Sequence, residues 1–392
     1  MPQSKRLVEL VQSRIDEYLL SREPIVTLIS SDLTPLIDYS RQFLSGGKRF
    51  RAQFCYWGAL SVLSPDSGPE SGPPEAPEPV IAPPGEGAAS AAVAPTPVGL
   101  AAIVSAAGAL EIFHAAALVH DDIIDNSDTR RGTSSAHKLF ESLHQREGWA
   151  GDPVSFGRAS AILLGDLLLG WSDELLDEGL YEIPDRAAAR RARLEFNHMR
   201  TEVTAGQYLD ILEERAWLAQ PEAELLDRAL RVIVFKSAKY SVQAPLVIGA
   251  ALAGASTAQL GSLRAFGLPL GMAFQLRDDL LGVFGDAAVT GKPSGDDLTE
   301  GKRTVLIALA RERLNQTDRA SLDAQLGDPT LDAGQIHAMQ QLISASGAVE
   351  RVEALIESQV AVALAALQTA PIGVAARQKL LDLTDRATRR AF

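Results

Sequence analysis

Apolar residues recur at intervals of three and four along most of this chain, a spacing that places them on one side of an α-helix. The strict alternation of apolar and polar residues that is typical of strands is scarce. The pattern therefore predicts an all-α fold in which long helices pack as a large bundle. The expected helices cover residues 3–22, 100–125, 158–179, 186–218, 222–253, 257–286, 302–325 and 346–368.

Proline interrupts this pattern at one place. Ten of the 21 prolines fall between Ser64 and Val98, a density that predicts a solvated, disordered loop. We expect this segment to be an insertion within a single domain of residues 1–392, because the charged motifs on its two sides belong to the same chemistry. A second, shorter loop is expected around residues 146–154.

The composition excludes several classes of protein. With 46% hydrophobic and 22% charged residues, the chain can bury a large core, which excludes wholesale disorder. Its 37 Lys and Arg against 50 Asp and Glu give a net charge of −13, which opposes nonspecific binding to nucleic acid. Cys55 is the single cysteine, so the fold cannot depend on an internal disulfide, and a cytoplasmic location is expected.

Neither a signal peptide nor a membrane span is expected. The N-terminal segment mixes charges into its apolar stripe, unlike a signal peptide. Two long uncharged windows exist, at residues 87–110 and 240–263. Pro95 and Pro97 interrupt the first, and the apolar part of the second is shorter than the roughly 20 residues that a span needs.

An apolar helix that ends in a group of carboxylates is the first motif with a chemical meaning. Residues 111–132 read EIFHAAALVHDDIIDNSDTRRG, and helical spacing puts Asp121 and Asp125 on one face with Asp122 beside them. Carboxylates this close repel one another, whereas Mg²⁺ binds one or two carboxylates together with substrate phosphate oxygens. A solvated run of surface aspartates is the alternative interpretation, and the apolar helix before them counts against it.

A second acidic helix repeats this arrangement. Residues 274–286 read FQLRDDLLGVFGD, and Gln275, Asp279, Gly282 and Asp286 are spaced to lie on one helix face. Two facing acidic helices can hold divalent ions between them. The sequence that follows, GKPSGDDLTEGKRT, adds two lysines among glycines, which is by itself a weak signal for binding an anion.

Cationic side chains accompany both acidic helices. His114 precedes the first aspartates on the same helical stripe, and Arg130 and Arg131 follow them with guanidinium groups suited to diphosphate oxygens. Residues 45–51 read SGGKRFR, and Lys236 opens the motif KSAKYS. Each basic patch alone is typical of solvated surface. Their occurrence with two aspartate motifs in one chain favours a site for a phosphorylated substrate.

Six motifs in this order, GGKRFR, DDIIDNSDTRRG, GQYLD, KSAKYS, FQLRDD and GKPSGDDLTEGK, resemble those of the trans-isoprenyl diphosphate synthases, the polyprenyl synthetase family. The resemblance is greatest to bacterial geranylgeranyl diphosphate synthases. It implies an isoprenoid synthase bundle of antiparallel helices around a central cavity, usually in a homodimer. It also implies a cluster of up to three Mg²⁺ ions, with isopentenyl diphosphate and an allylic diphosphate as substrates.

The resemblance also implies roles for individual positions. Both aspartate motifs are implied to bind Mg²⁺ through Asp121, Asp122, Asp125, Asp278 and Asp279, which are counted as catalytic together with Lys236. Isopentenyl diphosphate is implied to bind Lys48, Arg51, His114 and Arg131. The allylic diphosphate is implied to contact Arg130, Lys236, Ser237, Gln275, Lys292 and Lys302, and the GQxxD motif to point Gln207 and Asp210 toward the cavity.

Two positions depart from the family pattern. Gly282 stands where a third aspartate is common, so the second metal site is expected to use two carboxylates or to recruit Asp286 one turn further along the helix. Ser237 stands where threonine is common and keeps the hydroxyl group.

The implied reaction begins when metal ions and cations stabilise the departing allylic diphosphate, which leaves a delocalised carbocation. The double bond of isopentenyl diphosphate attacks this cation, and a proton is then lost to the released diphosphate. An apolar pocket is required because the cation would alkylate water.

Three residues below the first motif set the expected product length. Ala116 and Ala117 are small at positions where aromatic residues stop short products in the family, and Phe113 lies two turns below Asp121. Geranylgeranyl diphosphate is therefore the expected product, with farnesyl or longer polyprenyl diphosphates as alternatives. A terpene cyclase would not need Lys48, and a non-catalytic subunit would have lost more carboxylates than the one at position 282.

Overall fold

The computed structural model describes residues 3–63, 98–130, 132–286 and 294–389, and within these ranges the chain is almost entirely helical. The one sheet in these ranges is an antiparallel pair, β1 (Thr129–Arg130) and β2 (Thr133–Ser134), in which Thr129 faces Ser134. The predicted all-α fold is therefore confirmed. Most of the predicted insertion lies outside the described residues.

The helices have the following bounds. In chain order they are α1 (Gln3–Ile29), α2 (Thr34–Phe43), α3 (Phe50–Leu63), α4 (Leu100–Ile124), α5 (Ala136–Glu147), α6 (Pro153–Tyr181), α7 (Arg186–Ala216), α8 (Leu225–Val232), α9 (Ala244–Leu252), α10 (Thr257–Phe284), α12 (Asp296–Glu300), α13 (Val305–Arg313), α14 (Gln316–Gln325), α15 (Ala333–Ala345), α16 (Ala348–Thr369) and α17 (Val374–Thr388). Three short 3₁₀ turns, η1 (Ser31–Leu33), η2 (Trp217–Ala219) and η3 (Glu222–Glu224), and the π-helix η4 (Ile233–Gln243) complete the elements.

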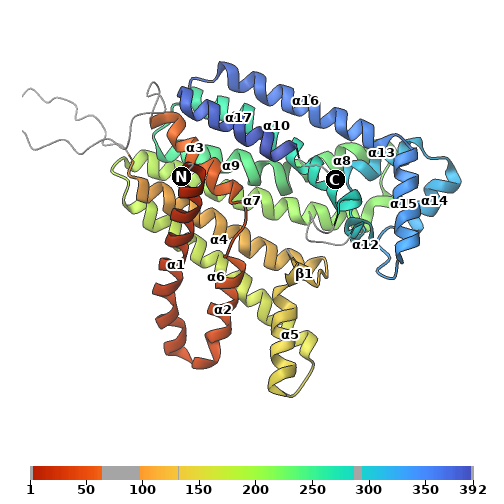
Figure 1. Cartoon of the computed structure of the whole chain (residues 1–392), viewed down its shortest axis with the longest axis horizontal. Helices are drawn as coiled ribbons and strands as arrows, with labels where there is room; N and C mark the ends of the chain where they lie inside the picture. The colour runs from red at the N-terminus through yellow and green to blue at the C-terminus, as the bar shows by residue number, and fades with distance from the viewer. Residues whose placement is uncertain (1–2, 64–97, 131, 287–293, 390–392) are drawn as a thin grey trace, which may run out of the picture.

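Helix α4 lies inside the body of the molecule, and the other elements are arranged around it. It packs along α6 and also contacts α1, α3 and α9, while α10 packs along α16 and η4. Figure 1 shows α16 and α17 along the top of the body and two arms, the α1–α2 hairpin and α5, projecting below it. Sixteen of the 25 residues of α4 are buried, because this helix is apolar on nearly all sides.

The core consists of two hydrophobic clusters that share three elements. The first is formed mainly by α1, α3, α4, α6, α7 and α9, and the second mainly by α8 and α13. Helix α10 contributes Leu263 and Leu270 to the first cluster and Leu276 and Leu280 to the second, and η4 and α16 are divided in the same way. These three elements are therefore fixed by packing in both clusters.

Several predicted helices have different bounds in the structure. Residues 222–253 were expected to form one helix, whereas α8, η4 and α9 divide this range. Residues 302–325 were expected to form another, but the backbone is extended at Leu314, and Asn315 then caps α14 by accepting a hydrogen bond from the Asp318 amide. The expected loop at 146–154 is confirmed, since α5 ends at Glu147 and α6 begins at Pro153.

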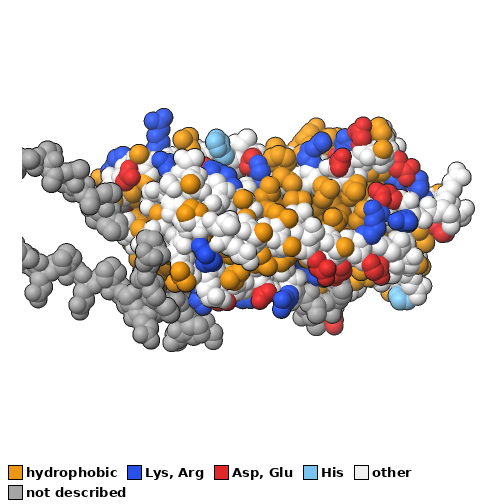
Figure 2. Space-filling model, turned by 90° about the horizontal axis from the view of Figure 1, so that it is seen from above, with side chains coloured by type: hydrophobic (Ala, Val, Ile, Leu, Met, Phe, Trp, Pro, Cys, Tyr) orange, Lys and Arg blue, Asp and Glu red, His pale blue; other side chains and the backbone are white. Residues whose placement is uncertain are grey.

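Three helices are long and apolar enough to cross a membrane by length and composition alone: α4, α6 and α16. The apolar window of α4 is 83% buried inside the protein, so the core accounts for its composition. The windows of α6 and α16 are 33% and 22% buried. Figure 2 looks down on the face that carries α16 and α17 and shows hydrophobic side chains gathered over much of it. The expected absence of a membrane span stays a prediction.

Burial should make the only thiol of the chain unreactive. Cys55 is fully buried in α3, and this burial raises the pKa of its thiol to about 12. We expect no reaction of native protein with Ellman's reagent at pH 8 and one thiol per chain after unfolding in urea. Rapid labelling of the native protein would contradict the packing described for α3.

Candidate active site

The carboxylates at the end of α4 are held by polar groups from other elements. Gln207 on α7 donates through Nε2 to Asp121 Oδ1 at 3.0 Å, and Lys236 Nζ on η4 lies 3.3 Å from the same oxygen. Asp125, the C-terminal cap residue of α4, accepts a hydrogen bond from Lys302 Nζ at 2.5 Å. Asp121 and Asp125 therefore face the same group of cations, as their spacing of four predicted.

Asp122 points instead toward the β-hairpin. Its side chain is 1% exposed and accepts hydrogen bonds from Arg130, with Nε at 2.8 Å and Nη2 as a second donor to the same oxygen. Arg130 Nη2 also lies 3.7 Å from Asp121 Oδ2. Arg130 thus fixes β1 to α4 and brings a third cation to the site. A role of Asp122 in metal binding stays a prediction.

Asp210 on α7 connects the lysines of this site. Lys236 Nζ donates to Asp210 Oδ2 at 2.5 Å, and Lys302 Nζ lies 3.6 Å from the same oxygen. The approach of η4 to α7 depends on Gly206, because a Cβ atom there would lie 2.4 Å from the Lys236 backbone nitrogen. The glycine and the aspartate of the GQxxD motif therefore act together, one by making room for Lys236 and the other by binding it.

The loop after α12 adds Lys302, which lies near carboxylates of α7 and α12. Lys302 Nζ lies 3.6 Å from Glu214 Oε1 and 3.9 Å from Glu300 Oε2, and its side chain is 12% exposed. Burial raises the pKa of Glu214 to about 7, with Lys302 opposing this shift and Asp210 adding to it. Carboxylates outnumber cations here, which favours the binding of additional positive charge.

Electrostatic pairing keeps the central groups ionised. Burial alone would raise the pKa of Asp121, but the charges of Lys236, Lys302 and Arg130 outweigh it and hold this pKa well below its ordinary value. Burial would lower the pKa of Lys236, but Asp121 and Asp210 raise it above its ordinary value. The site therefore holds fixed charges of both signs at neutral pH.

The second aspartate motif faces the same space. Gln275 Nε2 on α10 donates to Asp279 Oδ1 at 2.8 Å. Asp279 is 6% exposed, and this burial raises its pKa; the bond from Gln275 opposes the shift, and the negative charges of Asp297, Asp278 and Asp210 increase it. Asp210 also pairs with Lys236 and Lys302, the lysines that contact the first motif, so Asp210 links the two aspartate motifs.

The expectation that Asp286 continues the helix face of this motif was wrong. Helix α10 ends at Phe284, and Gly285 has an extended backbone with φ −68° and ψ 147°, so Asp286 follows outside the helix. Asp297 of α12 lies against Gly282 instead: a Cβ atom at position 282 would meet Asp297 Oδ2 at 2.0 Å. The Asp297 carboxylate therefore occupies the space that a side chain at position 282 would need.

Two residues that the resemblance assigned to isopentenyl diphosphate meet at Tyr240. The Arg51 guanidinium lies 4.2 Å from the centre of the Tyr240 ring and donates through Nη2 to Ser241 Oγ at 2.8 Å. The Tyr240 hydroxyl and His114 Nδ1 are 2.8 Å apart. Burial raises the pKa of Tyr240, with Arg51 opposing the shift, so the phenol stays protonated. Lys48 is exposed on the loop before α3.

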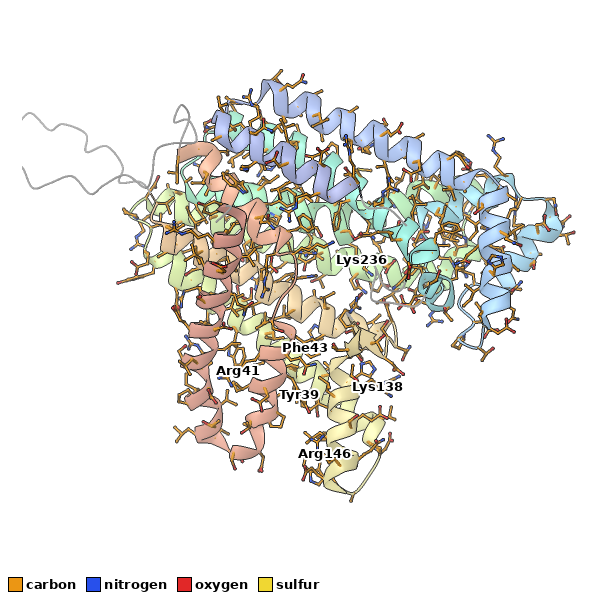
Figure 3. All side chains as sticks on the ribbon, in the orientation of Figure 1. Tyr39, Arg41, Phe43, Lys138, Arg146 and Lys236 are labelled. Carbon is orange, nitrogen blue, oxygen red and sulfur yellow. The ribbon has the colours of Figure 1, made fainter. Side chains whose placement is uncertain are left out.

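A cleft of about 210 Å³ opens between the end of α2, helix α4 and the β-hairpin. Figure 3 shows Phe43 at the body end of the α2 arm and Lys236 above it in the body of the molecule. The cleft is lined by Gln42, Phe43, Ser45, Ala115, Leu118, Arg130 and Thr133. Arg130 thus contributes to the wall of this cleft as well as to the aspartate site.

An aromatic group lies two turns below Asp121. The ring of Phe113 packs edge to face against Phe196 of α7, with ring centres 6.0 Å apart, and against Tyr240 at 5.8 Å. Phe113 is 4% exposed and Ala116 is fully buried, whereas Ala117 is half-buried. Phe113 therefore belongs to a buried aromatic group with Phe196 and Tyr240, and its role as the floor of the product pocket stays a prediction.

The donor groups of the two motifs are of the kind that Mg²⁺ binds. Among the residues that the structure describes, no group of three or more His, Cys, Asp or Glu side chains is arranged to hold a metal ion by itself. The side chains at the two motifs are carboxylates, which are ligands that Mg²⁺ prefers, and Mg²⁺ takes its remaining ligands from water and substrate phosphates. The residues therefore fit Mg²⁺ bound together with a diphosphate.

Sequence reasoning found most of the site and missed four contributors. Asp278 and Ser237 are half-buried beside Asp279 and Lys236, while Arg131 and Lys292 lie outside the described residues. The missed residues are Glu214, Tyr240, Asp297 and Phe196. Tyr240 lies in the motif KSAKYS and Asp297 in GKPSGDDLTEGK, so their place in these motifs could have marked them as site residues. Nothing in the sequence pattern marked Phe196 or Glu214.

Comparison with known proteins now identifies the class to which this fold and site belong. Residues 35–343 match the family model for polyprenyl synthetases. The match covers more than half of the chain, and the chain belongs to this family.

Two curated relatives illustrate its range. A geranylgeranyl diphosphate synthase of Mycobacterium tuberculosis is 30% identical over 282 residues, which cover 72% of this chain and 73% of that protein. A geranylfarnesyl diphosphate synthase of Aeropyrum pernix is 29% identical over 277 residues, 71% of this chain and 79% of that protein. The chain spans 60% and 66% of the short chain isoprenyl diphosphate synthases of Methanothermobacter thermautotrophicus and Methanocaldococcus jannaschii.

Solved structures confirm the isoprenoid synthase bundle. A geranylgeranyl pyrophosphate synthase from Corynebacterium glutamicum, complexed with isoprenyl diphosphate and magnesium, has a TM-score of 0.85 at 35% identity, over 98% of this chain and 99% of that chain. A polyprenyl synthase from Caulobacter crescentus, complexed with calcium and isoprenyl diphosphate, has a TM-score of 0.71 at 25% identity, over 99% of this chain and 98% of that chain.

The buried pair of Asp122 and Arg130 should contribute strongly to stability. Asp122→Asn leaves a buried guanidinium without the closer of its two carboxylate partners, and we expect the free energy of unfolding to fall by about 3 kcal/mol, measured in urea. Asp166→Asn is the control, since this carboxylate is 61% exposed beside His120 and should contribute less than about 1 kcal/mol. Equal effects of the two variants would contradict the prediction.

Proposed function

We propose that this chain is a magnesium-dependent trans-prenyltransferase that condenses isopentenyl diphosphate with an allylic diphosphate, with geranylgeranyl diphosphate as its main product. The observation that carries the proposal is the chain of contacts from Asp121 through Lys236 and Asp210 to Lys302, which gathers the first aspartate motif around one set of cations. The negative charge of Asp210 also raises the pKa of Asp279 in the second motif, which supports a site shared by the two motifs. Membership of the polyprenyl synthetase family supports it.

The carboxylates are the proposed holders of Mg²⁺. Up to three ions would be held by Asp121, Asp122 and Asp125 on one side and by Asp278 and Asp279 on the other. When bound, Mg²⁺ would join these carboxylates to diphosphate oxygens and offset their negative charge. The carboxylates of Asp121 and Asp125 now accept hydrogen bonds from lysines, so ion binding at this end of α4 would free those lysines for the substrate.

The cations are the proposed binding groups for the allylic diphosphate. Lys236, Lys302 and Arg130 stay protonated, because neighbouring carboxylates raise the pKa of each above its ordinary value against the effect of burial. Fixed positive charge stabilises a diphosphate more as it departs than while it is still esterified, and this difference accelerates ionisation. Ser237, Gln275 and Lys292 complete the proposed contacts.

Isopentenyl diphosphate is proposed to bind at Lys48, Arg51, His114 and Arg131. The carbon–oxygen bond to diphosphate breaks first and leaves the allylic cation. The double bond of isopentenyl diphosphate then attacks this cation, and a carbon–carbon bond forms. The proton that is then lost passes to the released diphosphate, and the product is an allylic diphosphate longer by one isoprene unit. Buried side chains such as Phe113 and Ala116 exclude water from the growing tail.

A third carboxylate of the second motif is proposed to come from Asp297. The family position for it is Gly282, and the Asp297 carboxylate fills the space above this glycine. Asp297 would therefore contribute to Mg²⁺ binding from α12 in place of a side chain on α10.

This assignment predicts that Asp297→Asn weakens Mg²⁺ binding about tenfold, measured by calorimetry in the presence of inorganic pyrophosphate. Gly282→Ala should have a similar effect, because its Cβ atom would displace the Asp297 carboxylate. Asp286→Asn is the matched control, since Asp286 lies beyond the end of α10, and should leave binding unchanged. Weaker binding in Asp286→Asn alone would reverse the assignment.

Product length is proposed to be limited by the aromatic floor. Phe113→Ala removes the ring that contacts Phe196 and Tyr240 and should shift the products toward alcohols longer than geranylgeraniol after phosphatase treatment. Phe140→Ala, which removes an equally buried ring from α5, should leave the products unchanged. An unchanged product from Phe113→Ala would place the floor elsewhere.

A homodimer in the cytoplasm is also part of the proposal. Helix α6 leaves the neighbouring side chains of Ile162 and Leu163 45% and 64% exposed, and exposed apolar side chains of this kind support association with a second copy. Sedimentation of the purified protein would test this, with a monomer at micromolar concentration as the contrary result.

The test of the proposed activity is incubation of the purified protein with Mg²⁺, labelled isopentenyl diphosphate and dimethylallyl, geranyl or farnesyl diphosphate in turn. Geranylgeraniol as the main alcohol after dephosphorylation would support both the reaction and the product. Longer alcohols would support the reaction alone, and no elongation of any primer would overturn it.

A further inference from the structure

A buried ion pair that the sequence motifs did not mark as functional anchors the loop that carries Lys48 and the first turn of α3, which carries Arg51. Arg49 lies between these two residues, and its side chain and that of Glu111 on α4 are each 5% exposed. Arg49 has a φ of 51°, in the left-handed region that side chains other than glycine rarely adopt. The backbone thus turns the Arg49 side chain inward, while Lys48 stays exposed.

Arg49 uses its guanidinium to fix three separate elements. Nη1 donates to Glu111 Oε2 at 3.3 Å, and Nη2 donates to Gln12 Oε1 on α1 and to the carbonyl oxygen of Leu44. Leu44 is the first residue after α2 and so marks the start of the loop. One side chain therefore connects the loop to both α1 and α4.

Glu111 fixes the other end of the loop with its second oxygen. Glu111 Oε1 accepts a hydrogen bond from the backbone amide of Ala52 at 3.0 Å, in the first turn of α3. A carboxylate at a helix N-terminus satisfies an amide that has no partner within the helix and interacts favourably with the helix dipole. Gln53 Nε2 adds a bond to the carbonyl oxygen of Lys48 at 2.6 Å.

The same helix α4 carries the partner of this loop in the proposed isopentenyl diphosphate site. His114 lies three residues after Glu111 on α4. Its ring forms a hydrogen bond with the hydroxyl of Tyr240, and the Arg51 guanidinium stacks over the Tyr240 ring. Helix α4 thus carries His114 and, through Glu111, also holds the turn of α3 next to Arg51. Loss of the anchor would loosen the start of α3 around Arg51 without moving His114.

We infer that Arg49 and Glu111 are positioning residues for isopentenyl diphosphate: the buried pair holds Lys48 and Arg51 in place opposite His114. Neither residue is assigned a contact with substrate. The inference rests on the proposed function, because it assumes that Lys48, Arg51 and His114 bind isopentenyl diphosphate.

A positioning role and a purely structural role predict different kinetics. A loosened loop must be ordered again each time isopentenyl diphosphate binds, so its KM should rise. The groups proposed for the allylic diphosphate, Lys236, Lys302 and Arg130, are held by α4, α7 and the β-hairpin through other contacts. The KM for the allylic substrate should therefore stay the same.

The experiment measures both KM values and kcat for wild type, Arg49→Met, Arg49→Lys and Glu111→Gln, with thermal unfolding of each protein. Arg311→Met is the control, because Arg311 forms a comparably buried pair with Asp323 at 2.9 Å, in α13 and α14. We expect Arg49→Met and Glu111→Gln to raise the KM for isopentenyl diphosphate about tenfold and to leave the allylic KM within about twofold. Arg49→Lys should recover part of the loss, since it restores the charge.

Several results would overturn the inference. These are unchanged KM values in the folded variants, an equal rise for both substrates, and the same pattern in Arg311→Met. Glu111→Gln keeps the size of the side chain and decides the question if Arg49→Met does not fold. Failure of both to fold would assign the pair a structural role. If the wild type condenses isopentenyl diphosphate but the variants change both KM values alike, this inference alone is overturned. An inactive wild type would overturn the proposed function as well.

Discussion

Charge compensation at the end of α4 is the interaction on which the rest of the site depends. Asp121 and Asp125 are brought together by helical spacing, and their repulsion is relieved by Lys236 from η4 and Lys302 from the loop after α12. Asp210 on α7 pairs with both lysines and so fixes three elements around one point. An arrangement with more carboxylates than cations binds further positive charge, and that excess is what makes a metal-assisted diphosphate site reasonable here.

Helix α4 organises the molecule because one apolar helix serves several purposes along its length. Its buried surface forms part of the core, Glu111 anchors the loop before α3, and His114 meets Tyr240. Phe113 packs against Phe196 two turns below the aspartates, at the place proposed for the floor of the product pocket. A tail that grows from Asp121 toward Phe113 would follow about 12 Å of helix, at 1.5 Å per residue.

Most of the fold followed from periodicity, and the exceptions have physical causes. Helices α4, α6, α7 and α10 are long enough for their pattern to be unambiguous, so each was predicted to within a few residues, apart from the start of α6. Helix α3 was missed because eight of its residues are buried and it has no polar face to reveal a period. The π-helix η4 was missed because the hydrogen-bond register of a helix cannot be read from its composition.

The site was predicted where chemistry is local and missed where it depends on tertiary contacts. The spacing of Asp121 and Asp125 and the pairing of Gln275 with Asp279 are properties of single helices, and both were found. The contact of Asp297 with Gly282 joins two elements across a loop, and the end of α10 at Phe284 depends on a backbone conformation that spacing does not encode. Arg49 and Glu111 are 62 residues apart, so only the fold reveals that they form a pair.

The most direct test of the account is a binding measurement rather than a rate. Calorimetry with farnesyl thiolodiphosphate, an allylic analogue that ionises slowly, would compare binding with Mg²⁺ and with the chelator EDTA. The account predicts that tight binding requires Mg²⁺ and is weakened in Asp210→Asn, because the cations and carboxylates of both motifs must act on one diphosphate. Equally tight binding with EDTA, or no binding when Mg²⁺ is present, would contradict it.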